Sequence, residues 1–381
     1  MSKNEDTRDP LPQAAGLDRR QFLGSGMALG AGTGGLLASL GLSQYANAQS
    51  AARAPSAGPR GRRFVPPPPL KYSQPPPLKD LRGKVAYISA ASDGIGLGIA
   101  RAASRAGMKV VIGYRNPERL AAALPLFEPG NAGVLPVWHD VTQREGWQKM
   151  LDTVIGHFGN LHLVVNNAGI KTLSEASKAS YALWDDTVAV NFTAIFNSVH
   201  VCLPHMLKHG EGGHFVTTAS MGGLLPGVNA GVYTSTKIAA VGIMEALRVE
   251  LERTTVGTGV FCPGAVNTDN YTGTGKVDPY LEKHMPAFMR GRKFKPVSMP
   301  PLEAGERVLN GVVHNDLFIL SHPEFKPGVA QRFEAIMDST PTVQKPIPPA
   351  RIAYERGVLT CDIYPLEIAH RKIKRDSYLK V

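Results

Sequence analysis

Short hydrophobic runs alternate along the chain with segments whose apolar residues recur at helical spacing. The runs cover residues 84–90, 109–114, 134–138, 161–166, 214–219 and 257–262, and helical patterns follow them, for example over 94–106 and after Asn116-Pro117. Strands that alternate with helices favour parallel pairing through right-handed crossovers. The pattern predicts an α/β fold, a doubly wound parallel sheet in a single domain, with a seventh edge strand at 317–320.

The first 48 residues do not fit this alternation. The pair Arg19-Arg20 is followed by Phe22-Leu23, a charge-free run over 24–44 rich in Gly, Ala and Leu, and an A-x-A pattern at 46–48. These features are typical of a twin-arginine export signal. A membrane span is the alternative, but glycine-rich runs of about 20 residues are weak candidates for one. We therefore expect residues 1–48 to be read by the twin-arginine export machinery and the protein to be periplasmic, with the cytoplasm as the alternative.

Residues 49–81 form a second distinct segment, with proline runs at 66–69 and 75–77. Such a composition favours extended polyproline II rather than a packed core. We predict a linker, either a spacer or a strap on the fold, ahead of a catalytic domain at 82–322.

Charge and cysteine content exclude some classes of function. The net charge is +11, yet the sequence has no interleaved basic and aromatic stripe and no nucleic-acid-binding motif, so we expect no nucleic-acid partner. The cysteines Cys202, Cys262 and Cys361 show no CxxC and no paired spacing. This argues against a disulfide framework and against a zinc site, and we expect no metal.

A glycine-rich turn lies between the first strand and the first helix. It reads Ser89-Ala90-Ala91-Ser92-Asp93-Gly94-Ile95-Gly96. Glycines at this place allow the backbone to approach a pyrophosphate, which rests on the N–H groups of the helix N-terminus. The turn therefore predicts a dinucleotide site.

The end of the second strand bears on the choice of nucleotide. Tyr114-Arg115 stands where a carboxylate would bond the ribose hydroxyls of NAD. An arginine suits the 2′-phosphate of NADP, whereas Asp93 is mildly unfavourable to that phosphate, and Arg115 stacked on the adenine is the alternative. We expect NADP rather than NAD, with NAD left open.

Candidate chemical groups follow in the second half. Tyr233 and Lys237 lie four residues apart, on one helical face. Ser220 ends the strand over 214–219, and Asn191 lies upstream in a helical pattern. Three further segments end strands: Asp140-Val141, Asn166-Asn167-Ala168-Gly169 and Pro263-Gly264-Ala265-Val266-Asn267-Thr268.

In their order and spacing, these motifs resemble those of the short-chain dehydrogenase/reductase family over residues 82–322. The resemblance implies that Asn191, Ser220, Tyr233 and Lys237 form the catalytic tetrad. It also implies the following cofactor-binding residues: Ser89, Ser92, Asp93, Gly94, Ile95, Gly96, Arg115, Asp140, Val141, Asn167, Ala168, Gly169, Tyr233, Lys237, Pro263, Gly264, Val266 and Thr268. One departure is Ala90, where the family has glycine: a negative φ there would be harmless, and a positive φ would weaken cofactor binding.

The implied reaction is hydride transfer between nicotinamide and a secondary alcohol or ketone. A free tyrosine, with a pKa of about 10, is a poor base at neutral pH, and a nearby ammonium favours its phenolate. Tyr233 would thus be the acid/base and Ser220 would hold the substrate oxygen. Lys237 would also bond the nicotinamide ribose, and Asn191 would hold a water in a proton relay.

Two regions after the tetrad complete the predicted domain organisation. Residues 270–300 would form a lid over the substrate, and residues 323–381 a C-terminal extension. The stretch 303–338 resembles a branch of the family that includes bacterial dehydrogenases of benzylic alcohols in lignin-derived aryl ethers, which implies a bulky or aromatic substrate. Residues 341–381 would wrap a neighbouring subunit or the domain surface, and the family implies a homodimer or homotetramer.

The predicted export would change how the enzyme obtains its cofactor. A periplasmic enzyme is not expected to meet a free nicotinamide pool, so the cofactor would be loaded before export and held tightly. Two further hypotheses stay open: a closed-cycle transhydrogenase with captive NADP(H), and a non-catalytic dinucleotide-binding protein. The fold alone does not decide between these hypotheses. The complete set of tetrad residues favours an enzyme.

Overall fold

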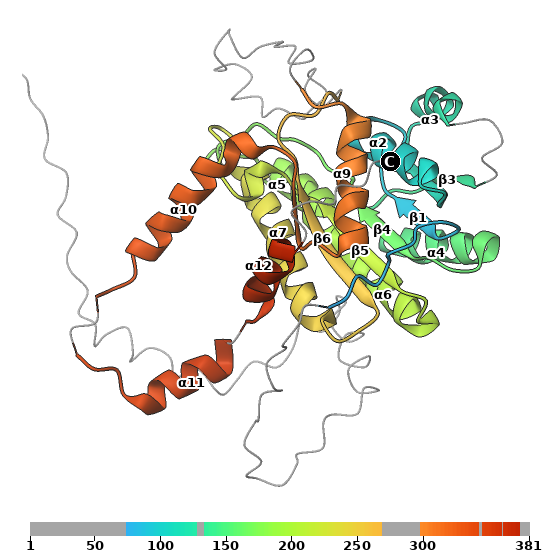
Figure 1. Ribbon diagram of the computed structural model, residues 1–381. Helices are drawn as coiled ribbons and strands as arrows, with labels where there is room; N and C mark the ends of the chain where they lie inside the picture. Colours follow the sequence, from blue (N-terminus) through green and yellow to red (C-terminus); the bar gives the residue numbers. More distant parts are fainter. Residues whose placement is uncertain (1–73, 128–132, 269–297, 343–344, 360, 374–381) are drawn as a thin grey trace, which may run out of the picture. The chain divides into compact units, whose positions relative to one another are not determined.

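A computed structural model describes residues 74–127, 133–268, 298–342, 345–359 and 361–373 of the chain (Figure 1). The predicted export signal, most of the proline-rich linker and nearly all of the predicted lid lie outside these residues.

The strands form one parallel sheet. They are β1 (Val85–Ile88), β2 (Lys109–Tyr114), β3 (Val134–Trp138), β4 (Leu163–Asn166), β5 (Gly213–Thr218), β6 (Val256–Cys262) and β7 (Phe318–Leu320). Their order is β3-β2-β1-β4-β5-β6-β7, and every neighbouring pair is parallel. The predicted doubly wound parallel sheet is confirmed, with each strand at its expected place in the sequence. The winding reverses between β1 and β4, and this reversal opens a crevice at the carboxyl ends of the strands.

Helices cover both faces of the sheet (Figure 1). On one face, α2 (Gly94–Arg105) and α9 (Pro301–His314) pack on the side chains of Ala86 and Ile88. On the other face, α4 (Arg144–Phe158), α6 (Ala194–His209) and α7 (Gly231–Leu251) pack on Val85 and Tyr87. Successive residues of a strand point to opposite faces, so the apolar strand β1 serves both cores. Shorter helices are α3 (Pro117–Ala123), α5 (Tyr181–Val188), the π-helix η2 (Ala189–Thr193), and the 3₁₀ turns η1 (Leu124–Leu126), η3 (Met221–Gly223) and η7 (Pro323–Phe325).

Helices α2 and α9 cross at unusually short range. A Cβ added at Gly98 would lie 1.9 Å from the carbonyl oxygen of Pro301, and one at Gly305 would lie 2.3 Å from the carbonyl oxygen of Gly98. No side chain fits between the two backbones at this point. The crossing therefore fixes α2, whose N-terminus belongs to the glycine-rich turn, against the sheet.

Residues 74–81, within the predicted linker, pack on the domain. Leu78 and Leu81 are buried, as is the side chain of Gln74. The two N–H groups of Gln74 Nε2 are shared among the carbonyl oxygens of Leu251, Thr254 and Val256, which lie at 3.1, 2.8 and 3.0 Å, respectively. This short segment is a strap that closes the turn between α7 and β6.

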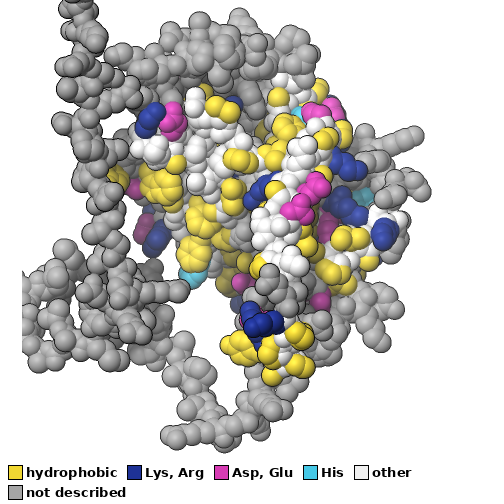
Figure 2. All heavy atoms as spheres, turned by 90° about the vertical axis from the view of Figure 1, so that its left-hand side faces the viewer, with side chains coloured by type: hydrophobic (Ala, Val, Ile, Leu, Met, Phe, Trp, Pro, Cys, Tyr) yellow, Lys and Arg dark blue, Asp and Glu magenta, His cyan; other side chains and the backbone are white. Residues whose placement is uncertain are grey.

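The C-terminal extension contains α10 (Lys326–Asp338), α11 (Pro349–Leu359) and α12 (Ile363–Ile373). Helix α12 packs on the domain, because Ile363 and Leu366 are buried and the Tyr364 hydroxyl donates to Glu245 of α7 at 2.9 Å. Helix α10 has no buried residue and exposes Phe333 and Met337. Figure 2 views the molecule from the left-hand side of Figure 1, the side on which α10 lies, and hydrophobic side chains are visible there. The described part of 341–381 thus contacts the domain surface through α12.

One helical stretch among the described residues is long and apolar enough to cross a membrane. It runs over Tyr181–His209, and 39% of its most apolar window is buried inside the protein. This stretch comprises α5, η2 and α6, and it carries the buried Asn191 within the domain. Its buried apolar residues, such as Ile195, Cys202 and Met206, belong to the hydrophobic core of the domain.

Candidate active site

A cavity of about 870 Å³ opens at the carboxyl ends of the strands. Its walls come from the loops after β1, β4, β5 and β6 and from the first turns of α7. A second cavity of about 320 Å³ lies at the ends of β2 and β3 and shares residues such as Asp93, Arg115 and Ile170 with the first. Together they form an elongated site at the place where the sheet reverses its winding, which suits a dinucleotide with a substrate beside it.

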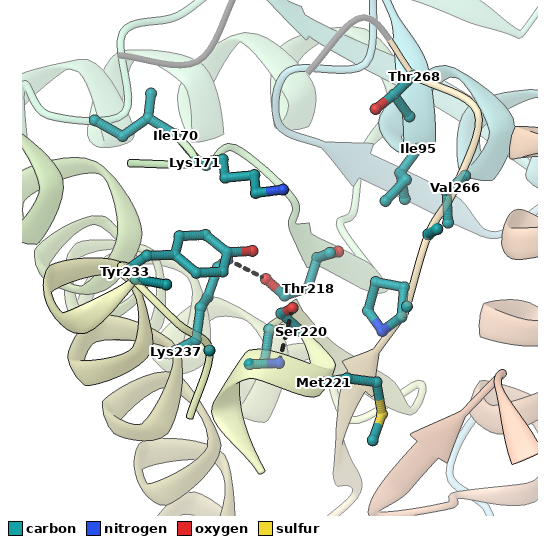
Figure 3. Close-up of a pocket in the computed structure, with 18 of the residues that line it drawn as sticks. Ile95, Ile170, Lys171, Thr218, Ser220, Met221, Tyr233, Lys237, Val266 and Thr268 are labelled. Carbon is teal, nitrogen blue, oxygen red and sulfur yellow. Dashed lines mark hydrogen bonds between the residues drawn. The ribbon is translucent and has the colours of Figure 1, made fainter. Parts of the chain in front are cut away.

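Three of the four predicted catalytic residues meet in the larger cavity (Figure 3). Tyr233 and Lys237 come from α7, and Ser220 follows β5. The Lys237 ammonium lies 5.7 Å from the centroid of the Tyr233 ring. It also donates a hydrogen bond of 2.8 Å to the carbonyl oxygen of Thr218. The Ser220 hydroxyl accepts from the N–H of Gly222 at 3.0 Å, which leaves its own proton available for a ligand.

The charge of Lys237 is unusually sensitive to its surroundings. The side chain is almost fully buried, and this desolvation lowers the Lys237 pKa from its ordinary range to about 8. The amine is still mainly protonated at neutral pH, so it places a positive charge beside the phenol of Tyr233.

Asn191 lies behind the cavity rather than in its wall. It sits in the π-helix η2, a local distortion that often marks functional positions. Its Oδ1 accepts from the N–H of Ile170 at 2.8 Å, and its Nδ2 donates to the Ile170 carbonyl at 3.0 Å and to Thr236 Oγ1 at 3.1 Å. Asn191 thereby fixes the loop after β4, a role that sequence reasoning missed.

Most of the predicted cofactor-binding residues line one or both cavities. Those in the walls are Ser92, Asp93, Gly94, Ile95, Arg115, Val141, Asn167, Ala168, Gly169, Tyr233, Lys237, Pro263, Gly264, Val266 and Thr268. Ser89, Gly96 and Asp140 are outside these walls, although they adjoin them.

Ser89 and Gly96 shape the site from behind. The buried Ser89 hydroxyl accepts from the N–H groups of Asn167 and Ala168, both at 2.9 Å. It ties the turn after β1 to the segment after β4. A Cβ at Gly96 would lie 2.4 Å from the carbonyl oxygen of Ala90, so only glycine allows the turn to close this tightly.

The smaller cavity contains an arginine that the sequence analysis did not single out. Arg119 Nη1 lies 3.0 Å from Asp93 Oδ2, and Arg115 Nη1 lies 3.5 Å from Asp140 Oδ2. Burial alone would raise the pKa of Asp140, but hydrogen bonds from Thr142 and the nearby Arg115 outweigh it and lower the pKa. Asp93, which was expected to disfavour a 2′-phosphate, is neutralised by Arg119. The sequence carried no signal for Arg119, because Arg115 lies ahead of helix α3 and the two residues do not share a helical face.

Two features of the site fit an adenine nucleotide. His139 lines the smaller cavity, and its Nε2 is buried with no hydrogen-bond partner among the described residues. Burial lowers the pKa of His139 to about 4, so the ring is neutral. The N-terminus of α2, capped by Asp93, faces the larger cavity and offers backbone N–H groups to an anion.

The segment after β6 is held by the end of β7. The N–H of Gly264 donates to His322 Nδ1 at 3.0 Å, and the His322 Nε2 lies 3.2 Å from the carbonyl oxygen of Ala265. These bonds orient the stretch that continues to Val266 and Thr268 along the cavity.

Ala90 adopts the conformation that the sequence analysis considered unfavourable. Its φ is +50°, in the left-handed region that favours glycine. The residue lines both cavities, so the strain lies at the centre of the nucleotide site.

One group of potential metal ligands occurs among the described residues. It lies near the amino ends of β4 and β5, away from the two cavities. Ligand atoms of His162, His209 and Glu211 lie within 4.8 Å of one another. His162 Nδ1 accepts from the N–H of Val85, and its Nε2 bonds Glu211. Both ring nitrogens of His209 are also engaged, with the carbonyl of Leu161 and the N–H of Glu211. The cluster is already a complete hydrogen-bond network.

Comparison with known proteins agrees with this geometry. A family model described as short chain dehydrogenase matches residues 84–276. The chain belongs to the short-chain dehydrogenase family. A C alpha-dehydrogenase from Sphingobium sp. (strain NBRC 103272 / SYK-6) is 28% identical over 270 residues, which are 69% of this chain and 88% of that protein.

Two solved structures extend the similarity to three dimensions. A short-chain dehydrogenase structure from Novosphingobium aromaticivorans has a TM-score of 0.64 and 30% identity, and covers 77% of this chain and 99% of its own. A family member from Burkholderia phymatum, in complex with NAD, has a TM-score of 0.60 and 26% identity, with 70% and 99% covered. This dehydrogenase is accordingly an oxidoreductase of a family that uses NAD(P) and acts on small molecules.

The strain at Ala90 leads to a prediction. Ala90→Gly should raise the free energy of unfolding by about 0.5 kcal/mol, because relief of the left-handed backbone outweighs the added freedom of the unfolded chain. Denaturant unfolding measures the change. Ala121→Gly, in the exposed part of α3, is the control and should lower stability by about 1 kcal/mol. Equal losses in both variants would contradict the assigned strain.

Proposed function

We propose that this dehydrogenase transfers hydride between NAD(P) and a secondary alcohol or ketone, with Tyr233 as the acid/base. The observation that supports this most strongly is the meeting of Tyr233, Lys237 and Ser220 in one cavity of about 870 Å³. When bound, the nicotinamide would accept or supply the hydride; the protein's own groups must then hold the substrate oxygen and move its proton.

Each group has a role that follows from its contacts. The Ser220 hydroxyl, oriented by the N–H of Gly222, donates to the substrate oxygen. The Tyr233 hydroxyl exchanges a proton with that oxygen, and the positive charge of Lys237 stabilises the phenolate that remains after donation. Asn191 keeps the loop after β4 in place through both bonds to Ile170, and our expectation of a water relay through Asn191 stays a proposal.

The substrate's body is proposed to be apolar, and the reactive end of the cavity supports this. Leu173, Leu225 and Phe325 line it together with Met221. The similarity to a C alpha-dehydrogenase supports an aromatic alcohol as the first class to test. The family resemblance likewise supports a homodimer or homotetramer as the proposed assembly.

NADP is the proposed cofactor. Arg115 and Arg119 both line the smaller cavity, and the carboxylate of Asp93 is paired with Arg119. A 2′-phosphate placed between two guanidinium groups gains charge-assisted hydrogen bonds that NAD lacks.

The acid/base assignment predicts the effect of removing one oxygen. Tyr233→Phe should lower kcat for oxidation of 1-phenylethanol by roughly 100- to 10,000-fold, the usual contribution of a general acid/base. Nucleotide affinity should be retained, because the ring remains. Nicotinamide absorbance gives the rate and calorimetry gives the affinity. Tyr181→Phe, an exposed position, is the control. Turnover near the parent level in Tyr233→Phe would refute the mechanism.

The cofactor assignment predicts a selective loss of affinity. Arg115→Ala and Arg119→Ala should each weaken NADP binding by roughly 10-fold, the value of one lost charge-assisted bond, and should change NAD binding much less. Calorimetric titration with both nucleotides measures this. Arg101→Ala, whose side chain bonds Leu126 outside both cavities, is the control. Parallel weakening of NADP and NAD would count against NADP as the preferred cofactor.

Export through the twin-arginine route to the periplasm remains a proposal supported by sequence alone. Because that route carries folded proteins, the cofactor would be bound before export and retained. The closed-cycle transhydrogenase follows only if retained NADP(H) is reset by a second substrate.

The export proposal predicts a sharp difference between two arginine pairs. Replacing Arg19 and Arg20 with lysine should leave the protein in the cytoplasm, because the export machinery reads the arginine pair itself. Lysine at Arg62 and Arg63, the pair in the predicted linker, should leave localisation unchanged. Cell fractionation with immunodetection distinguishes the two. Unaltered export after the first replacement would rule out the twin-arginine assignment.

A further inference from the structure

His322 lies at the junction between the sheet and the C-terminal extension. It follows β7 and immediately precedes the 3₁₀ turn η7. Its ring contacts the segment after β6: the N–H of Gly264 donates to Nδ1 at 3.0 Å, and Nε2 lies 3.2 Å from the carbonyl oxygen of Ala265. Neither the tetrad nor the predicted set of cofactor-binding residues includes this histidine.

The two bonds determine the chemical state of the ring. A backbone N–H can only donate, so Nδ1 carries a lone pair, and a carbonyl oxygen can only accept, so Nε2 carries the proton. The Ser321 hydroxyl lies 2.8 Å from the same Nδ1 and can donate to that lone pair. In this arrangement His322 is the neutral tautomer that matches one donor and one acceptor of the backbone.

The segment after β6 packs directly against His322. A Cβ added at Gly264 would lie 2.8 Å from Cδ2 of His322 and 2.8 Å from Cε2 of Phe325. The two rings contact each other edge to face, with centroids 6.3 Å apart. One short turn at the start of the C-terminal extension therefore holds both the Gly264 peptide and the ring of Phe325.

The segment that His322 contacts lines the catalytic end of the site. Residues 263–266 and Thr268 line the larger cavity together with Tyr233, and none of them lines the smaller cavity. Phe325 also lines the larger cavity, whereas His322 is outside the walls of both. For hydride transfer, the nicotinamide half of the cofactor has to reach the end that contains Tyr233. The segment 263–268 is thus a wall for that half, and His322 supports the wall from behind.

Backbone bonds hold the peptide groups on either side of Gly264. The N–H of Met221 donates to the carbonyl oxygen of Pro263 at 2.9 Å, and Met299 exchanges bonds with Ala265 and Asn267 at 3.0 and 2.9 Å. The bond at the Gly264 N–H is made by a side chain instead. A substitution at His322 can therefore remove it while the backbone bonds of the segment remain.

We propose that His322 is a positioning residue for the nicotinamide half of the cofactor. It binds the peptide groups of Gly264 and Ala265 and so fixes the wall for this half, and its contact with Phe325 keeps that wall in a constant place relative to the substrate cavity. The role rests on the proposed function, because it concerns the cofactor of the same site. His322 acts through the segment 263–268 and needs no contact of its own with cofactor or substrate.

The test compares ligands with and without the nicotinamide half. NADP and adenosine 2′,5′-bisphosphate, the adenosine half of NADP, are titrated calorimetrically into the purified protein. His322→Ala should weaken NADP binding by roughly 10-fold, the effect of losing neutral hydrogen bonds that preorganise the wall. The affinity for the bisphosphate should change little, because this ligand does not reach the segment. NAD and adenosine 5′-monophosphate form a parallel pair, which makes the test independent of the choice between NAD and NADP.

Conservative variants assign the effect to individual atoms. The amide oxygen in His322→Asn can take the place of Nδ1 and keep the bond from Gly264, whereas the amide nitrogen in His322→Gln can take the place of Nε2 and keep the bond to Ala265. Both variants should retain more NADP affinity than His322→Ala. His205→Ala is the control, because His205 accepts from the N–H of Leu161 at 3.3 Å outside both cavities. Its NADP affinity should equal that of the parent.

Hydrogen exchange gives a readout that needs neither nucleotide nor turnover. In the nucleotide-free protein, the Gly264 amide should exchange faster in His322→Ala and His322→Gln than in the parent and His322→Asn, because only the latter two keep its acceptor. Mass spectrometry of peptides that cover residues 261–268 measures the exchange.

The outcomes distinguish this role from the proposed function. Equal weakening of NADP and the bisphosphate in His322→Ala, or unchanged binding of NADP, would overturn the positioning role and leave the dehydrogenase mechanism standing. Absence of turnover of 1-phenylethanol by the parent would count against the proposed function. The calorimetric comparison would still decide the role of His322 in that case.

Discussion

Seven parallel strands end at one edge of the sheet, and the winding reverses between β1 and β4. This arrangement obliges the loops after β1, β4, β5 and β6 to meet around one crevice, whatever their sequences. Four segments that lie far apart in the chain thus come together: the glycine-rich turn at 89–96, the segment 166–169, Ser220 and the stretch 263–268. Helix α7 then adds Tyr233 and Lys237 from the side.

The topology brings the loops close, and buried polar bonds set their final positions. Ser89 joins the turn after β1 to the segment after β4, while Asn191 holds the next residues of that segment. Neither side chain is part of the cavity wall. Each satisfies backbone groups that would otherwise lie unpaired beside the cavity, which makes the positions of Ala168 and Ile170 well determined.

The sequence contained enough information for the sheet, which rests on local patterns, and the family resemblance pointed to Ser220, Tyr233 and Lys237, which meet in one cavity. The runs over 109–114 and 134–138 are the strands β2 and β3, and the spacing of Tyr233 and Lys237 holds for any regular helix. Arg119 was not foreseen, since its importance comes from the wall that it shares with distant residues and from its pairing with Asp93. The positive φ of Ala90 was equally inaccessible, because alanine normally avoids that region.

The strap at Gln74 attaches to the domain at the amino ends of the strands, the edge opposite the crevice. The two N–H groups of its side chain are shared among three carbonyl groups between the end of α7 and the start of β6. Asn315, beyond α9, also donates to the carbonyl oxygen and the Oε1 of Gln74, so the strap joins the base of α7, the start of β6 and the end of α9. The loops around Tyr233 lie at the far end of the same helix, so the strap and the catalytic groups act on opposite ends of α7.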